Sequence, residues 1–216
     1  MSVEFNKSGV IKVDNIGINS NILLGTHTNN FTTNTATAND RDKGIMSAGS
    51  GGNGTFSITQ EDDLPVGIYS YNVVGNTSGN RDFQQGGIPY EAGKQYVGSW
   101  WAKGSGTCLY RSWDRTKSGQ PMSTTFTLTD DWKYYCHTFT ATQAMEDDDC
   151  TFHLGVTGNS TIHICGMKLE EGSVPTPWCL NENEDGYLSN KHGFIEIGNT
   201  MKIYENIIQT NNFIEY

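Results

Sequence analysis

The chain has 216 residues, carries 24 acidic against 14 basic side chains, and has a formal net charge of −10 at pH 7. This length suffices for one substantial domain with extensions. Because affinity for nucleic acid depends on Lys and Arg side chains that neutralise phosphates, the acidic charge argues against a nucleic-acid partner. No apolar stretch approaches the length of a membrane span, so membrane insertion is not expected either.

The composition predicts an all-β fold. The chain contains 25 glycines, 11% of its residues are aromatic and only 18% are charged, a balance typical of β proteins. Apolar residues recur at every second position between turn clusters, whereas no window sustains a period of 3.6.

The two ends of the chain resemble each other. Residues 9–16 align without gaps on residues 206–213, and residues 193–197 form a partial third copy. Short strands of this kind need a neighbour to cover an apolar face. We expect strand segments at 1–19 and 181–216, flanking a domain at 20–180. They serve either as contacts between subunits or as edge hairpins of a monomer. The first residues lack the pattern of a secretory signal.

Within the domain, alternation and turn residues predict a β-sandwich. A first strand is expected at 22–25, followed by a long polar loop at 28–54 that includes a short strand piece at 34–38. A second loop is expected at 79–87. The remaining predicted strands cover residues 55–58, 67–74, 96–102, 108–113, 123–128, 132–140, 151–156 and 161–169.

Five cysteines leave at least one unpaired, and none has the spacing of a metal-binding pair. We expect buried free thiols that behave as small apolar side chains. A bridge from Cys165 to Cys136 or Cys150 is the alternative.

Four motifs of packing and turns carry a family resemblance. They are Trp-Ala-Lys-Gly at 101–104, Leu-Thr-Asp-Asp-Trp at 128–132, Phe-Thr-Ala at 139–141, and Leu-Glu-Glu-Gly-Ser followed by Thr-Pro-Trp at 169–178. Together they resemble carbohydrate-binding jelly-roll modules of the family 4/9 type, as found in tail and appendage proteins of bacteriophages and prophages. The resemblance implies a jelly-roll sandwich and a saccharide ligand. The long Thr- and Asn-rich stretch near the start departs from the family pattern.

The alternation of side chains along two strands predicts a sugar-binding platform. The family pattern places Trp100 inside the sandwich and Trp101 outside, and Arg111 and Trp113 share one side of the next strand. Outward Trp101, Arg111 and Trp113 would combine a stacking surface with a polar donor, which is how proteins bind the apolar face of a sugar. The alternative is that these aromatic rings belong to the core. Trp132 and Trp178 are expected to be structural.

Three further residues complete the candidate carbohydrate-binding set. His153 has outward parity, and Arg81 and Gln85 would rim a cleft from their loop. Three mid-strand histidines, including His137 and His163, have no spacing that favours zinc.

No cofactor is predicted. The resemblance allows a structural calcium ion near Glu170, Glu171 and the backbone at Asn21, but only their position in the chain supports it. Acidic residues occur in runs typical of solvated turns, not as the separated pair that glycoside hydrolysis requires. No catalytic residue is predicted.

The sequence therefore predicts a non-catalytic phage or prophage virion protein, made in the bacterial cytoplasm. Its module would recognise bacterial surface polysaccharide, and its terminal segments would join other tail proteins or further copies of the chain, with a trimer as the guess. The alternative is a purely structural tail, baseplate or head-decoration protein that binds no glycan.

Overall fold

The computed structural model describes residues 2–5, 11–14, 21–26, 32–33, 46–50, 54–76, 79–114, 119–145, 150–181, 202–204 and 207–209. The strands are β1 (Ser2–Phe5), β2 (Ile11–Asp14), β3 (Thr32–Thr33), β4 (Met46–Ser50), β5 (Thr55–Gln60), β6 (Tyr69–Val74), β7 (Asn80–Gln85), β8 (Gln95–Asp114), β9 (Gly119–Thr127), β10 (Lys133–Thr140), β11 (Cys150–Glu171), β12 (Lys202–Tyr204) and β13 (Ile207–Gln209). A short 3-10 helix, η2, covers Gln143–Met145. Among these described residues, no helix has the length and apolar character needed to cross a membrane.

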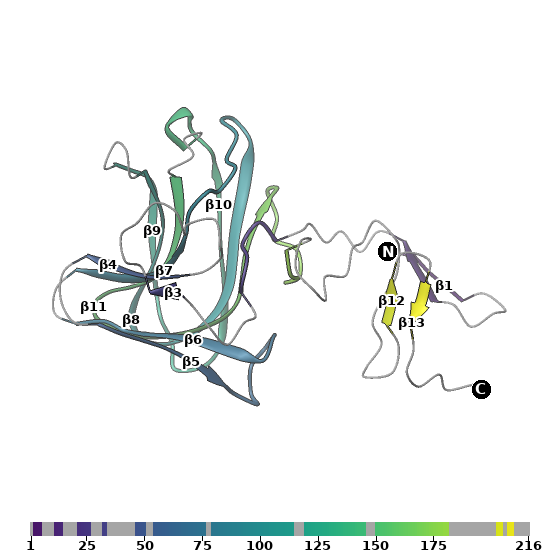
Figure 1. Ribbon diagram of the computed structural model, residues 1–216, viewed down its shortest axis with the longest axis horizontal. Helices are drawn as coiled ribbons and strands as arrows, with labels where there is room; N and C mark the ends of the chain where they lie inside the picture. Colours follow the sequence, from purple (N-terminus) through teal and green to yellow (C-terminus); the bar gives the residue numbers. More distant parts are fainter. Residues whose placement is uncertain are drawn as a thin grey trace.

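Strands β3 to β11 form one continuous nine-stranded sheet that bends over into two layers (Figure 1). Layer I contains β5, β6, β10, residues 95–104 of β8 and residues 161–171 of β11. Layer II contains β3, β4, β7, β9, residues 107–114 of β8 and residues 150–157 of β11. The two long strands therefore run through both layers and connect them.

Glycines permit the bend between the layers. Gly104 and Gly106 of β8 have φ values of 143° and 88°, which side chains disfavour. A Cβ atom at Gly104 would lie 2.0 Å from the carbonyl oxygen of Thr161, and one at Gly106 would lie 2.2 Å from Ser160 Oγ. The strands predicted at 96–102 and 108–113 are thus two halves of β8. The same correction applies to the strands predicted at 151–156 and 161–169, which are both part of β11.

The core lies between the layers. Trp100 of layer I contacts Tyr110 and Phe126 of layer II, with ring centroids 5.1 and 5.3 Å apart. Near the other side of the core, Phe83 of layer II meets Tyr71 of layer I at 5.4 Å. Four of these rings belong to one cluster of buried apolar side chains, and the partly buried ring of Phe126 packs against that cluster. Aromatic contacts at such distances add to the gain from burying apolar area.

The predicted fold, an all-β jelly-roll sandwich flanked by short terminal strand segments, is confirmed. Two local predictions are wrong. Residues 22–25 are not a strand, although Ile22 N donates a hydrogen bond to Leu169 O at 2.7 Å. The loop predicted at 79–87 contains β7.

The long stretch at 28–54, predicted as a loop with short strand pieces, contains β3 and β4. The pieces predicted at 34–38 and 193–197 lie outside the described residues.

The two ends of the sandwich are joined to each other. Asn181 Nδ2 donates to the carbonyl oxygens of Asn21 and Ile22, at 2.7 and 3.2 Å. Asn21 Oδ1 in turn accepts from the backbone of Leu23 and of Leu169 on β11. The chain therefore enters and leaves the sandwich at one place.

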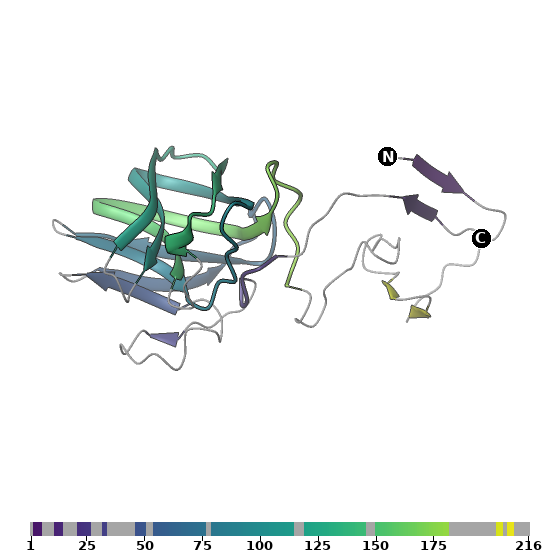
Figure 2. The same ribbon diagram turned by 90° about the horizontal axis from the view of Figure 1, so that it is seen from above.

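The terminal strands form two small sheets of their own. Strand β1 pairs with β2, and β12 pairs with β13, both antiparallel. In both views these pairs lie on the same side of the sandwich and away from it (Figures 1 and 2). The domain boundaries at residues 19 and 180 stay a prediction.

Residues 172–181, which we call the exit strap, cross the outside of layer I. Below the strap, fully buried Lys168 donates to Thr176 Oγ1 at 2.6 Å and to Pro177 O at 2.9 Å. Its Nζ also lies 3.3 Å from Glu170 Oε2, and Thr176 N donates to the other oxygen of Glu170 at 2.7 Å. A buried ion pair thus fixes the strap to the sheet.

Candidate functional site

The outer face of layer II, which points away from the core, carries a charged network centred on Asp82. Arg111 Nη2 donates to Asp82 Oδ2 at 2.9 Å, and His153 Nδ1 lies 2.9 Å from Asp82 Oδ1. Because a carboxylate only accepts hydrogen bonds, Nδ1 of His153 carries the proton. Its Nε2 contacts the hydroxyl of Thr151. Strand register explains the grouping, since His153 is directly paired with Arg111 and lies beside β7.

The network is buried and its carboxylate is stabilised as the anion. Asp82, His153 and Arg111 are 0%, 4% and 6% exposed. Burial by itself would raise the pKa of Asp82, but the charge and hydrogen bonds of His153 and Arg111 outweigh it and lower that pKa below its ordinary value of 3.8. Both residues therefore have their orientation fixed by an ionised partner.

Gln84 extends this surface. It is the register partner of His153 on β7 and is 2% exposed. Its Nε2 is buried and donates to no group among the described residues. Buried polar atoms in folded proteins almost always have a partner. At the edge of the same face, exposed Ser123 on β9 pairs in register with Arg111. The face thus combines fixed charges, an amide nitrogen that is unpaired among the described residues, and an accessible hydroxyl.

Two residues of the predicted set meet here, and a third shares their face. Arg111 and His153 are both bound to Asp82, so the structure brings them together. They are not solvent-exposed as predicted, because their polar atoms turn to a buried carboxylate. Trp113 lies two positions beyond Arg111 on β8, opposite Thr151, and so has the same parity. Its side chain lies outside the described part of the structure.

Trp101 belongs to a different surface. It has outward parity as predicted and is partly exposed, but it lies in layer I, paired in register with Tyr134. Ten residues of β8 separate it from Arg111, which corresponds to about 33 Å of extended strand, and the bend at Gly104 and Gly106 lies between them. The predicted single platform of Trp101, Arg111 and Trp113 is therefore not formed.

Arg81 and Gln85 do not rim a cleft. Both alternate with core residue Phe83 on β7, so they have the opposite parity to Asp82. Gln85 Oε1 accepts a hydrogen bond from Leu24 N at 2.8 Å. The stem of Arg81 covers Gly54, where a Cβ atom would lie 2.5 Å from Arg81 Cγ. These side chains hold neighbouring segments in place.

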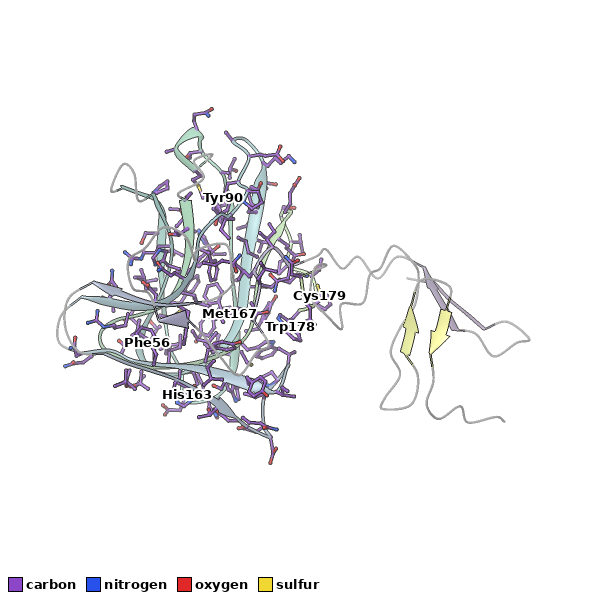
Figure 3. All side chains as sticks on the ribbon, in the orientation of Figure 1. Phe56, Tyr90, His163, Met167, Trp178 and Cys179 are labelled. Atoms are coloured by element: carbon purple, nitrogen blue, oxygen red, sulfur yellow. The ribbon has the colours of Figure 1, made fainter. Side chains whose placement is uncertain are left out.

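The remaining sequence-based candidates lie apart from this network. The histidines predicted as a zinc alternative do not converge, since His137 contacts core rings and His163 lies near the outside of layer I (Figure 3). Glu170, considered for calcium, is bound to Lys168 and Thr176. Among residues with described side chains, no group of three or more His, Cys, Asp and Glu could hold a metal ion. The five cysteines are free thiols.

Sequence reasoning missed Asp82 and Gln84. The segment Asn80–Gln85 is almost entirely polar, so it lacks the alternation that marks a strand. Such a polar strand is recognised only in the folded structure, where neighbouring strands supply hydrogen-bond partners for its polar side chains. The one local signal was Phe83, a large apolar residue flanked by polar ones.

Comparison with solved structures shows a fold shared with carbohydrate-binding modules. A family 4 carbohydrate-binding module matches 69% of this chain and 99% of its own length, with 17% identity and a TM-score of 0.50. A protein of Bacteroides thetaiotaomicron, described as a candidate sugar-binding protein, matches over 70% of this chain and 100% of its own length, with 12% identity and a TM-score of 0.54.

A bacteriophage protein also has a similar region. The enzymatically active domain of tailspike protein 4 of bacteriophage CBA120 matches 59% of this chain, with 16% identity and a TM-score of 0.43. The match covers 19% of that tailspike chain, and at this TM-score it carries no argument. No family model and no curated protein sequence matches the chain.

Proposed function

We propose that this chain is a non-catalytic virion protein of a bacteriophage or prophage, part of a tail or appendage, whose sandwich recognises polysaccharide on the bacterial surface. Two findings support the proposal. The fold is shared with carbohydrate-binding modules, and the packing motifs resemble the modules embedded in phage appendage proteins. Fold alone does not fix function, so the case depends on the site.

The single observation that carries the proposal is the outer face of layer II. Gln84 has a buried amide nitrogen with no hydrogen-bond partner in the described part of the chain, beside Arg111 and His153 that Asp82 already holds in place. Such groups recognise hydroxyls with little further loss of side-chain entropy, because their rotamers are fixed beforehand. Trp113, with the same parity on β8, is the stacking residue of this proposal. The net charge of −10 favours a neutral glycan over an anionic one.

A glycan array supplemented with bacterial polysaccharide extracts tests this site. We expect wild type to bind, and Gln84→Ala and Trp113→Ala to lose at least about tenfold in affinity, the loss of about 1.4 kcal/mol. Ile68→Ala is the matched control, because Ile68 is 54% exposed and lies outside layer II. Full binding by both layer II variants would overturn the site. Absence of binding across all extracts would overturn the function.

The terminal strand pairs are the proposed attachment to the virion. A two-stranded sheet is at best marginally stable alone in water, and the exit strap and Asn21 direct both chain ends to one place on the sandwich. We expect the full chain to form a closed homo-oligomer, with three copies as the working number. Light scattering of the full chain and of residues 21–181 tests this. A full chain that runs as a monomer contradicts it.

One observation favours the second candidate, a purely structural tail, baseplate or head-decoration protein. The polar groups of Arg111 and His153 are directed to Asp82, and both residues are almost completely buried. In that role the network holds β7, β8 and β11 together and contacts no ligand. A stable oligomer that binds no glycan on the array would favour this structural role.

A further inference from the structure

The outer face of layer I carries a second group of aromatic and charged side chains. Tyr134 on β10 is paired in register with Trp101 on β8, and Lys103 on β8 with His163 on β11. We call Tyr134, Trp101, Lys103, Trp132, His163 and Glu61 the Trp101 strip. It shares no residue with the Asp82 network and lies in the other layer.

Aromatic rings form one end of the strip. The rings of Trp101 and Tyr134 are 5.3 Å apart at 55° to each other. Tyr134 is 38% exposed, and Trp101 is half-buried. Behind Trp101, Gly166 leaves room for the side chain of Val66, since a Cβ atom there would lie 2.3 Å from Val66 Cγ2, and the indoles of Trp101 and Trp178 are in ordinary contact range of the same point, at 3.7 and 3.6 Å. Trp101 is therefore held from one side and accessible from the other.

Charged groups form the other end. Lys103 Nζ lies 4.7 Å above the ring of Trp132, 3.3 Å from Glu61 Oε2 and 3.5 Å from Asp63 Oδ2. Burial would raise the pKa of Glu61, but hydrogen bonds from Thr59 and Lys103 outweigh it and lower that pKa. An ionised acceptor and an ammonium donor are thus fixed beside the aromatic pair.

One more polar atom points to a ligand. His163 Nδ1 is buried and makes no hydrogen bond with any described residue, and it lies 3.5 Å from Glu61 Oε1, an ion-pair distance without hydrogen-bond geometry. Figure 3 labels His163 on the outside of the sandwich, away from Met167. A buried ring nitrogen without a hydrogen bond is costly, and a hydroxyl that reaches Nδ1 and Glu61 would satisfy it.

We propose that the Trp101 strip is a second saccharide-binding surface, which rests on the proposed function in that the ligand is the same class of glycan. One pyranose stacks on Trp101 and Tyr134, and Lys103, Glu61 and His163 take hydroxyls of the next unit. Glu61 and Asp63 repel acidic sugars, so the ligand is a neutral polymer. With sites on opposite faces of the sandwich, one chain contacts two polymer strands and gains avidity on a dense surface.

Native mass spectrometry with neutral hexasaccharides of glucose and of xylose tests the count of sites. We expect two ligands per wild-type chain, and one per chain for Tyr134→Ala and for Gln84→Ala. Tyr134 is exposed, so its replacement leaves the fold intact. The control is Val174→Ala, which removes a side chain that is 69% exposed and outside the strip; it should keep both ligands.

Affinity electrophoresis through neutral polysaccharide gels gives the matching affinity. Loss of a stacking ring should weaken retardation about tenfold in Tyr134→Ala, and Lys103→Gln should weaken it less. If Tyr134→Ala is retarded as strongly as wild type, and only Gln84→Ala loses one ligand per chain, the Trp101 strip is not a binding surface. The proposed function would still hold in that case. No retardation and no bound hexasaccharide for wild type overturn both.

Discussion

The two outer faces of the sandwich use polar residues in opposite ways. On layer II, Asp82, Arg111 and His153 are buried and joined to each other. On layer I, the ion pairs of Lys103 with Glu61 and Asp63 are partly accessible to solvent and lie beside the partly exposed rings of Trp101 and Tyr134. A charge removed from water must find a partner, whereas a charge at the surface has water as an alternative. The same residue types therefore support the fold on one face and remain available to a ligand on the other.

We expect the largest loss of stability from replacement of Asp82. Replacement by Ala leaves the Arg111 guanidinium buried without its carboxylate, which costs about 3–5 kcal/mol of the free energy of unfolding. Urea denaturation measures this loss. Asp63→Ala, on the accessible side chain that faces Lys103, serves as the matched control and should change the free energy of unfolding far less. Similar losses of unfolding free energy in both variants would show that the two faces do not differ in this respect.

Substitution of Lys168 tests whether the buried ion pair below the exit strap contributes to stability as the buried network of layer II does. Lys168→Met should cost about 3 kcal/mol, because the buried carboxyl of Glu170 loses its ion-pair partner; Thr176 still donates two hydrogen bonds to it. The double variant Lys168→Met with Glu170→Leu should recover much of that loss, since no buried charge remains. Urea denaturation and limited proteolysis at residues 172–181 follow the effect. A double variant weaker than the single one would contradict this account.

The pH dependence of stability tests the contribution of Asp82 on layer II. The pKa of Asp82 is lower in the folded protein than its ordinary 3.8, so its contribution to stability is complete above that value and is lost as the pH falls below it. The free energy of unfolding of wild type should therefore decline below about pH 4, and Asp82→Asn should show a shallower decline. Denaturation curves at several acidic pH values measure both slopes, and equal slopes would exclude Asp82 as the main source.

The smallest effect is expected at Asp63. Its carboxylate is mostly exposed and lies 3.5 Å from Lys103 Nζ, and exposed pairs contribute about 0–1 kcal/mol. Asp63→Asn should leave stability nearly unchanged, and any difference from wild type should disappear in high salt because ions screen the pair. A loss of stability that persists in high salt would show that this pair is shielded from solvent, as the Asp82 network is.

Alternation within the sequence predicted most strands of the sandwich, and the family pattern predicted which side Trp100 and Trp101 face. Trp100 is in the core and Trp101 faces outward because successive residues of a strand point to opposite sides. The motifs at 101–104, 128–132 and 169–178 likewise indicated the jelly roll, since they are packing and turn motifs of that fold. Such local signals survive in a single sequence because they depend on neighbours along the chain.

Only the tertiary structure decided which outward residues meet. Arg111 and Asp82 are 29 residues apart, and His153 is 71 residues from Asp82, so their contact depends on the register of three strands. The bend at Gly104 and Gly106 separates Trp101 from Arg111, although both have outward parity on one strand. Parity gives a side chain its direction, but burial and partners come from the segments that the fold brings against it. For this reason the sequence predicted the architecture, and the two faces became distinct only in three dimensions.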